Sequence, residues 1–284
     1  MAGNKQAIKA RLRSVKTTKK ITKAMQMISN AKLARIRKEM ETNRTYATTL
    51  HELVEGILRN EDKDVKSVFF AEHKSTKAFN VLFCSDLGLC GGYNANILKY
   101  ARENIAKEDP LVVFGTHAYS QLKNEGFNIV NPLTSIDNLN ETELYKEMDY
   151  GIELYCKDEV SKIQILYTKF INTVSFEPCI DVILPYEKSE FEKEESMKLV
   201  KEIIYDPSVE KVLDDLIIQM VHNVAYALTL ETKTAEQASR RMAMENATDN
   251  AEELQESLTL QYNQIRQAGI TQEITEIVSA ADAV

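Results

Sequence analysis

The stretch IRKEMETNRTYATTLHELVEGI, residues 36–57, decides the fold of this chain. Apolar residues recur in it at alternating steps of four and three, with one polar residue among them: Ile36, Met40, Asn43, Ala47, Leu50, Val54 and Ile57. This spacing is a heptad seam, the stripe along which one helix packs against another. The surrounding residues contain no Pro and only Gly3 and Gly56, so the pattern predicts one helix from Ala2 to about Arg59.

Upstream of residue 36 the seam is expected to continue with a change of phase. The residues that extend it are Ile21, Met25, Ile28 and Lys32, with one extra step of four. Such an insertion unwinds a supercoil locally, so the sequence predicts a break in the regular packing here.

The C-terminal part of the chain gives a second long helical pattern. Residues 208–283 contain no Pro and one Gly. Three apolar stripes follow one another: Leu216, Met220, Val224 and Ala227; then Ala247, Ala251, Leu254, Leu258, Tyr262 and Ile265; then Ile270, Ile274, Ile277 and Ala281. At 1.5 Å per residue the two helices would be roughly 87 and 114 Å long, too long for one compact domain. They are predicted to project and to bury their stripes against each other as an antiparallel coiled coil.

Between these helices, strand and helix patterns alternate. AFNVLFCSD and DPLVVFGT read as strands, each followed by a helix, and GFNIVNP as a weaker third strand. Asn94 or Asn96 is the expected cap of the first of these helices. A helix from about Asn140, weakened by Gly151, leads to a pair of strands in residues 161–185. The predicted fold class is α/β with a mostly parallel sheet, divided into an N-terminal coiled-coil helix (1–59), an α/β domain (75–200) and a C-terminal coiled-coil helix (208–284).

Charge separates the two ends of the chain. Residues 1–40 carry 12 Lys or Arg and one Glu, whereas residues 206–284 carry 5 Lys or Arg and 14 Asp or Glu, within a chain of net charge −8. A basic helix can bind nucleic acid. However, residues 1–40 contain no aromatic residue and no helix-turn-helix or finger pattern, which favours a protein partner.

The stretch SDLGLCGGYN, residues 85–94, is the strongest local candidate for chemistry. It places Cys90 on a glycine-rich turn after a strand, as a nucleophile elbow would. A cysteine nucleophile needs a base, and only His117 is placed to approach it, which leaves a cysteine-dependent hydrolase as the alternative function. The loop fits neither phosphate-binding glycine motif, and no metal or cofactor constellation is present, so none is expected. No apolar run long enough to span a membrane occurs.

The C-terminal stretch LTLQYNQIRQAGITQEITEIVSAADAV ends a long helix with small and β-branched residues. An exposed helix end is usually charged, so an apolar end suggests insertion into an apolar socket of another protein. Ahead of it, Arg266, Gln267 and Thr271 are within reach of one another on a helix and could dock a polar loop of that partner.

Three segments together resemble the γ subunit of F-type ATP synthase, in order and over essentially the whole chain: IKARLRSVKTTKKITKAMQMIS, SDLGLCGGYN and ASRRMAMENATDNAEEL with the C-terminal stretch above. The resemblance implies a central rotor stalk that couples ion-driven rotation of the c-ring to conformational changes in the catalytic β subunits. It also implies a non-catalytic chain whose Cys90 belongs to a structural turn.

The resemblance further implies partners and contact residues. The expected partners are the α and β subunits, the ε subunit and the c-ring, with one copy per complex at the cytoplasmic face of the bacterial cell membrane. The implied contacts are Lys23, Met25, Arg241, Arg266, Gln267 and Thr271 with β; Ile270, Ile274, Ile277 and Ala281 in an apolar bearing; and Tyr205 and Asp206 with the c-ring.

Overall fold

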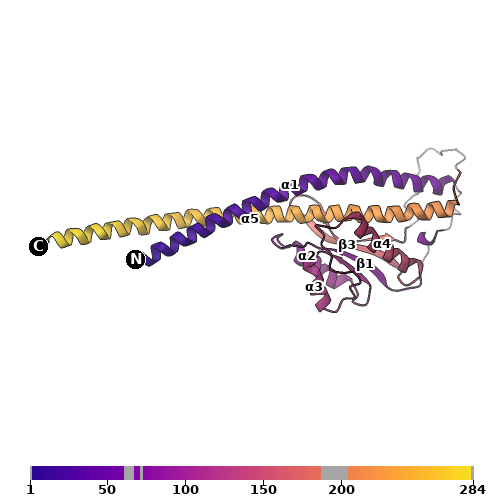
Figure 1. Cartoon of the computed structure of the whole chain (residues 1–284), viewed down its shortest axis with the longest axis horizontal. Coiled ribbons are helices and arrows are strands. Elements are labelled where there is room, and N and C mark those ends of the chain that lie inside the picture. Colours follow the sequence, from indigo (N-terminus) through magenta and orange to yellow (C-terminus); the bar gives the residue numbers. More distant parts are fainter. Residues whose placement is uncertain (1, 61–66, 71–72, 187–203, 283–284) are drawn as a thin grey trace. The chain divides into compact units, whose positions relative to one another are not determined.

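The computed structural model describes residues 2–60, 67–70, 73–186 and 204–282. It separates into two compact units, one formed by Met1–Ala31 with Arg240–Val284 and the other by Lys32–Ser239. Two long helices supply both units: α1 (Ala2–Asn60) and α5 (Val209–Asp282). Each runs without interruption, as the sequence predicts (Figure 1). The proposed division of the chain into three domains stays a prediction.

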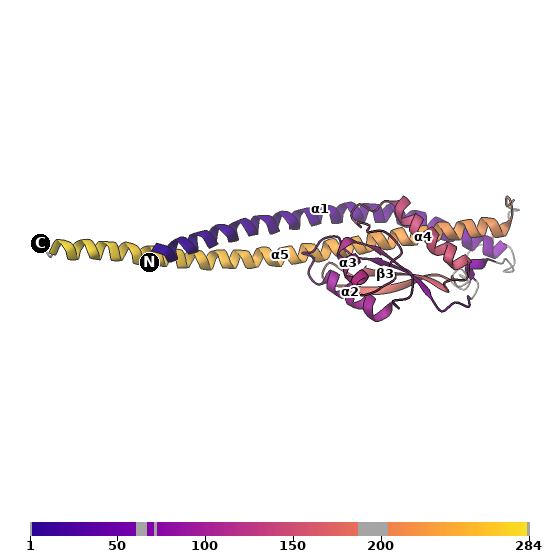
Figure 2. The same cartoon turned by 60° about the horizontal axis from the view of Figure 1, so that its bottom comes forward.

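Within residues 32–239, α1 and α5 lie side by side and antiparallel (Figures 1 and 2). The predicted seam is confirmed here, because Ile36, Leu50, Val54 and Ile57 are all buried. The polar seam residue Asn43 accepts a hydrogen bond of 2.7 Å from Asn223 on α5. The heptad stripe of residues 36–57 is therefore the surface that joins the two helices in this unit.

Upstream of residue 36 the predicted seam is wrong. Ile21 and Ile28 are 55% and 58% exposed, while Thr22 and Ser29 are buried. The buried positions Thr22, Ser29 and Ile36 are seven residues apart, so the heptad continues without the predicted insertion. A regular supercoil keeps its phase, and small polar side chains occupy the seam although larger apolar ones are next to them.

Lys32 and Leu254 are corrected in the same way. Lys32 is exposed and its neighbour Leu33 is buried in its place. Leu254 is 39% exposed, and its neighbour Gln255 is half-buried in its place. In both helices the helical phase, not the size of the apolar side chain, decides which residue is buried.

A four-stranded sheet forms the second layer of the unit of residues 32–239. Its strands are β1 (Ala78–Phe83), β2 (Leu111–Phe114), β3 (Lys162–Phe170) and β4 (Phe176–Leu184), in the order β2-β1-β3-β4. Strand β1 is parallel to β2 and β3, and only β4 is antiparallel, so the predicted mostly parallel α/β fold is confirmed. The weak strand expected in GFNIVNP is reduced to isolated bridges, such as that between Leu111 and Ile129.

Helices cover both faces of the sheet. One face packs on α2 (Tyr93–Asn104) and α3 (Thr116–Asn124), and the other on α4 (Glu141–Cys156) together with α1 and α5. A short 3-10 helix, Val68–Phe70, adds the buried Phe69 to this second core. Side chains of β1 alternate between the two cores, as the two-residue period of a strand requires.

Two local details differ from the sequence prediction. The residue before α2 is Gly92, which makes no side-chain cap, and Asn94 is instead buried inside the fold. Gly151 is predicted to weaken α4, but the helix continues through this position. The ring of Phe79 lies against Gly151, and a Cβ atom there would be 2.5 Å from the nearest ring carbon. Close packing of helix on strand therefore explains this glycine.

Candidate functional site

The glycine loop after β1 is held by the side chain of Asn94. Its Oδ1 accepts hydrogen bonds from the hydroxyl of Ser85 at 2.7 Å and the thiol of Cys84 at 3.2 Å. Its Nδ2 donates toward the carbonyl of Leu87 and the sulfur of Cys90, each at 3.4 Å. One buried amide thus links the start, middle and end of the loop, which fixes its shape.

Cys90 is 1% exposed and sits inside this loop. The residue before it, Leu89, and the residue after it, Gly91, both have positive φ values of 62° and 58°. The turn therefore directs the thiol inward, toward Ser85 and Asn94, and not out to solvent as in a nucleophile elbow. Among the described hydrogen bonds of Cys90, none involves His117, so the hydrolase alternative gains no support from the geometry.

Asp86 fills the position at the carboxyl ends of β1 and β2 where α/β folds commonly bind an anion. Its carboxylate accepts hydrogen bonds from the backbone N–H of Thr116 at 2.9 Å, of Ile136 at 3.2 Å and of Asp137 at 2.9 Å, and from the hydroxyl of Ser135 at 2.6 Å. Thr116 is the first residue of α3, so the donors that could hold a phosphate at this helix start are satisfied by the protein itself.

The same hydrogen bonds shift the pKa of Asp86. Burial is the largest single influence and raises its pKa, but the bonds from Ser135 and from three backbone N–H groups together lower it below the usual value. The carboxylate is therefore stabilised in its ionised form, as a structural anion that ties the glycine loop to the loop of residues 134–137.

Helix α5 is joined to the sheet and to the glycine loop by buried hydrogen bonds. The hydroxyl oxygens of Tyr93 and Thr232 lie 2.8 Å apart, and the backbone N–H of Thr168 on β3 donates to Thr232 at 3.2 Å. About two turns further on, the hydroxyl of Ser239 donates to the carbonyl of Cys90 at 2.6 Å. These residues form the α5 joint: Tyr93, Cys90, Thr168, Thr232 and Ser239.

Helix α1 reaches the same region through a surface ion pair. Lys32 Nζ lies 3.1 Å from Asp137 Oδ2, and both side chains are more than a third exposed. An exposed pair of this kind contributes about 0–1 kcal/mol. Most of the attachment of α1 within residues 32–239 therefore comes from its apolar seam with α5.

In the unit formed by the two chain ends, the contacts between α1 and α5 are more polar. The hydroxyl oxygens of Thr22 and Thr248 share a hydrogen bond of 2.8 Å, and Lys19 Nζ lies 2.7 Å from Glu252 Oε1. Ser29 is buried, and its Oγ has no partner among the described residues. Polar side chains thus share this part of the seam with buried apolar residues such as Met244 and Leu258.

Three of the residues predicted to contact a β subunit lie on α1 and α5, in the unit formed by the two chain ends. Lys23 is exposed and Met25 is half-buried. Arg241 is half-buried and its Nη1 lies 3.1 Å from Glu245 on the same helix. These positions are compatible with a contact surface, but their contact with a β subunit stays a prediction.

A second group of predicted contacts lies on the last turns of α5. Arg266, Gln267 and Thr271 are all exposed, and the hydroxyl of Thr271 donates to the carbonyl of Gln267 at 3.0 Å. Ile270, Ile274 and Ile277 are 48%, 57% and 69% exposed. The side chain of Ala281 lies outside the described residues. An apolar surface of this kind on a helix indicates a partner, whose identity as a bearing stays a prediction.

The two predicted c-ring contacts lie just before α5, in the unit of residues 32–239. Tyr205 is half-buried against the core, and Asp206 is exposed. The predicted contacts thus belong to both units of the chain.

Sequence reasoning missed the residues that hold the loop and the α5 joint. The sequence patterns do not single out Asp86, Thr232 or Ser239, and they predict Asn94 only as a possible helix cap. An Asp directly after a buried strand is a signal that could have identified Asp86, because carboxyl ends of parallel strands meet there. Nothing local marks Thr232 or Ser239, since their partners are more than 60 residues away.

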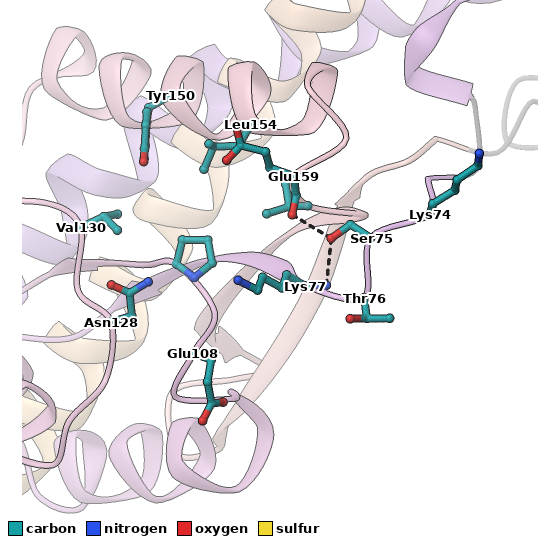
Figure 3. A pocket seen from close by; sticks show the side chains of 12 residues that line it. Lys74, Ser75, Thr76, Lys77, Glu108, Asn128, Val130, Tyr150, Leu154 and Glu159 are labelled. Carbon is teal, nitrogen blue, oxygen red and sulfur yellow. Dashed lines mark hydrogen bonds between the residues drawn. The ribbon is translucent and has the colours of Figure 1, made fainter.

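A cavity of about 540 Å³ lies at the opposite, amino-terminal ends of β1 and β2 (Figure 3). The hydroxyl of Ser75 donates to the carbonyl of Glu159 at 2.7 Å and accepts from the N–H of Lys77. Two lysines and two glutamates line the cavity together, so its charges balance and favour no single class of ligand.

The described part of the chain offers neither a metal-binding cluster nor a membrane-spanning helix. No group of three or more His, Cys, Asp or Glu side chains there is placed to hold a metal ion. No helix there is both long enough and apolar enough to cross a bilayer.

Comparison with known proteins gives one family. The family model described as ATP synthase matches residues 4–284. The chain is 39% identical over 282 residues to the ATP synthase gamma chain of Mycoplasma capricolum subsp. capricolum, with 98% of each chain covered. It is 35% identical over 283 residues to that of Alkaliphilus metalliredigens, again with 98% of each chain covered.

Solved structures agree at the level of the fold. A chain of the mitochondrial ATP synthase of Euglena gracilis matches with a TM-score of 0.68 and 18% identity, over 100% of this chain and 95% of that chain. A chain of the central stalk and c-ring structure of Tetrahymena thermophila ATP synthase matches with a TM-score of 0.55 and 20% identity, over 80% and 99%. Nothing in these comparisons supports a hydrolase. The chain belongs to the ATP synthase family and, within it, to the γ chains that form the central rotor stalk.

Proposed function

We propose that this chain passes rotation from the c-ring to the catalytic β subunits and that it contributes no catalytic residue of its own. The observation that carries the proposal is the α5 joint. A rotor stalk is turned at its α/β domain and acts through its helices, so the connection between the two must resist shear. Buried hydrogen bonds such as those of Thr232 and Ser239 do so because a low local dielectric strengthens them and water cannot replace them.

The proposed partners are the α and β subunits, the ε subunit and the c-ring, at the cytoplasmic face of a bacterial cell membrane. The relatives from Mycoplasma capricolum and Alkaliphilus metalliredigens are bacterial, which supports this setting. The surface of α5 around Arg266 and Thr271, with the exposed isoleucines after it, is proposed to meet the catalytic hexamer. Tyr205 and Asp206 are proposed to face the c-ring.

A substitution at the α5 joint tests the proposal. Thr232→Val removes the hydroxyl that bonds to Tyr93 and Thr168 while keeping the shape of the side chain. Ion pumping per ATP hydrolysed should fall in a complex reconstituted in vesicles, because the joint loses a buried hydrogen bond that contributes about 1 kcal/mol. ATP hydrolysis without a gradient should change less, because the catalytic residues lie on other subunits.

Thr229→Val is the matched control. Thr229 is buried on the same helix, but among the described residues its hydroxyl bonds only to the carbonyl of Ala225 one turn earlier, at 2.8 Å. It should therefore leave the pumping ratio unchanged. Equal losses in the two variants, or no loss in either, would show that the joint does not carry the rotation.

A further inference from the structure

Three helices of the unit of residues 32–239 line an open cavity of about 460 Å³, and none of the proposed rotor contacts is among its lining residues. It lies where α4 packs beside α1 and α5 (Figure 2). Its volume falls within the ~300–1,000 Å³ that small-molecule sites occupy. All of its lining residues belong to this one unit.

Tyrosine rings from each of the three helices line the cavity. Tyr46 comes from α1, Tyr145 from α4 and Tyr226 from α5. The ring of Tyr145 stacks on His222, with centroids 4.5 Å apart and planes 13° apart, and His222 Nε2 lies 2.7 Å from Asp149 Oδ1. One wall of the cavity is thus held in a fixed orientation.

The ionisable side chains of the cavity other than tyrosine are two carboxylates and the imidazole of His222, which is paired with Asp149. Glu39 and Glu141 line it, and none of the described lining residues is Lys or Arg. Burial raises the pKa of Tyr145 to about 12, and the negative charge of Glu141 contributes to the rise. The pKa of Tyr226 is raised by burial and then by Glu39 and Glu141. Glu141 therefore acts on both tyrosines, whereas Glu39 acts on Tyr226, where the guanidinium of Arg35 opposes it.

We infer that this cavity is a binding site for a small organic cation of the alkylammonium or polyamine class. The face of an aromatic ring attracts a cation, and several rings beside a carboxylate are the arrangement that recognises organic ammonium groups. Each exposed ring contributes about 0.5–1 kcal/mol, which is roughly a two- to fivefold gain in affinity. A bound cation would contact α1, α4 and α5 at once and would hold the α/β domain to both long helices.

One cation of the protein competes for this site. Arg35 Nε lies 3.0 Å from Glu39 Oε1, but the Arg35 side chain is 83% exposed. An exposed pair of this kind is weak and exchanges with other cations. Removal of Arg35 should therefore strengthen the binding of an external cation, whereas removal of a lining carboxylate should weaken it.

Titration calorimetry of the purified full chain with spermidine tests the inference, with KCl at matched ionic strength as the blank. Saturable binding is expected, weakened about threefold or more by Glu141→Gln and about two- to fivefold by Tyr46→Leu. Arg35→Gln should tighten it. Both lining residues are exposed at the helix surface, so the variants should fold, which far-UV circular dichroism checks.

Glu52→Gln is the control for charge alone, because Glu52 is exposed on α1 but does not line the cavity. It removes the same charge as Glu141→Gln and should leave the affinity unchanged. Equal weakening by the two variants would show diffuse attraction to an acidic protein and would overturn the site. An absence of saturable binding would overturn it as well. Neither result bears on the rotor function, which the pumping ratio tests.

Discussion

Asn223 on α5 donates a hydrogen bond of 2.7 Å from its Nδ2 to the Oδ1 of Asn43 on α1, at the one polar position of the heptad stripe of residues 36–57. Apolar seam residues above and below it would tolerate a shift of one heptad, but an amide pair is satisfied in one register only. This contact therefore fixes the alignment of the two helices within residues 32–239.

Replacement of one amide should cost more than replacement of both. Asn43→Leu leaves the amide of Asn223 without its partner and should lower the free energy of unfolding by about 1–3 kcal/mol. The double variant with Asn223→Leu should recover much of that loss, since an apolar pair buries no unpaired group. Urea unfolding of the purified chain measures both values, and Asn30→Leu, at an exposed position of α1, is the control.

At Ser29, replacement of the polar side chain is expected to stabilise the protein, in contrast to Asn43. It is 1% exposed and its Oγ has no described partner, so the hydroxyl is buried at a cost. Ser29→Ala should raise the free energy of unfolding by about 1 kcal/mol more than Ser14→Ala, an exposed substitution on α1 that reports helix propensity alone. Equal effects of the two changes in thermal unfolding would mean that the buried hydroxyl is satisfied in solution.

Asp86 should make stability depend on pH in the acid range. Its folded-state pKa lies below the unfolded value of about 4, so its contribution is complete above that value and is lost as pH falls through the folded value. Asp86→Asn should destabilise the chain by about 2 kcal/mol at pH 7, and the difference from wild type should shrink below about pH 4. Unfolding curves between pH 3 and 7 measure it. A difference that is constant over that range would mean that Asp86 does not titrate as the structure implies.

Two helical glycines should respond with opposite signs. A Cβ atom at Gly151 would be 2.5 Å from the ring of Phe79, so Gly151→Ala should destabilise by about 1–3 kcal/mol. At Gly56 in α1 nothing lies within 4 Å, so Gly56→Ala should stabilise by about 0.5–1 kcal/mol. Thermal unfolding of the two variants under one set of conditions makes the comparison, and a stable Gly151→Ala variant would show that α4 can move away from β1.

The proposed contact of Arg266 with a β subunit is tested in the assembled complex. A charged hydrogen bond at an interface contributes roughly 1.5–3 kcal/mol, so Arg266→Ala should weaken assembly or coupling, and Gln267→Ala should weaken it less. Binding of the chain to the catalytic hexamer at low and high salt, together with ATP hydrolysis, measures the effect. Wild-type behaviour of both variants at both salt concentrations would exclude the contact.

The sequence by itself determined the long helices and the alternation of strands and helices. Both are local patterns: the heptad of residues 36–57 and the apolar runs of β1 and β2 each fit one backbone period. The segments that resemble γ subunits also lie within short windows, which is why the family could be identified before the fold.

Only the tertiary structure decided which residue is buried where an apolar and a polar residue are adjacent and either could face the partner helix. At residues 21 and 22, and again at 28 and 29, an isoleucine adjoins a small polar residue, and the structure buries the polar one because the supercoil keeps its phase with the partner helix. The α5 joint is likewise invisible in the sequence, since Tyr93 and Thr168 reach Thr232 across 139 and 64 residues. Local periodicity ranks side chains by their own hydrophobicity, whereas burial depends on which face a distant segment covers.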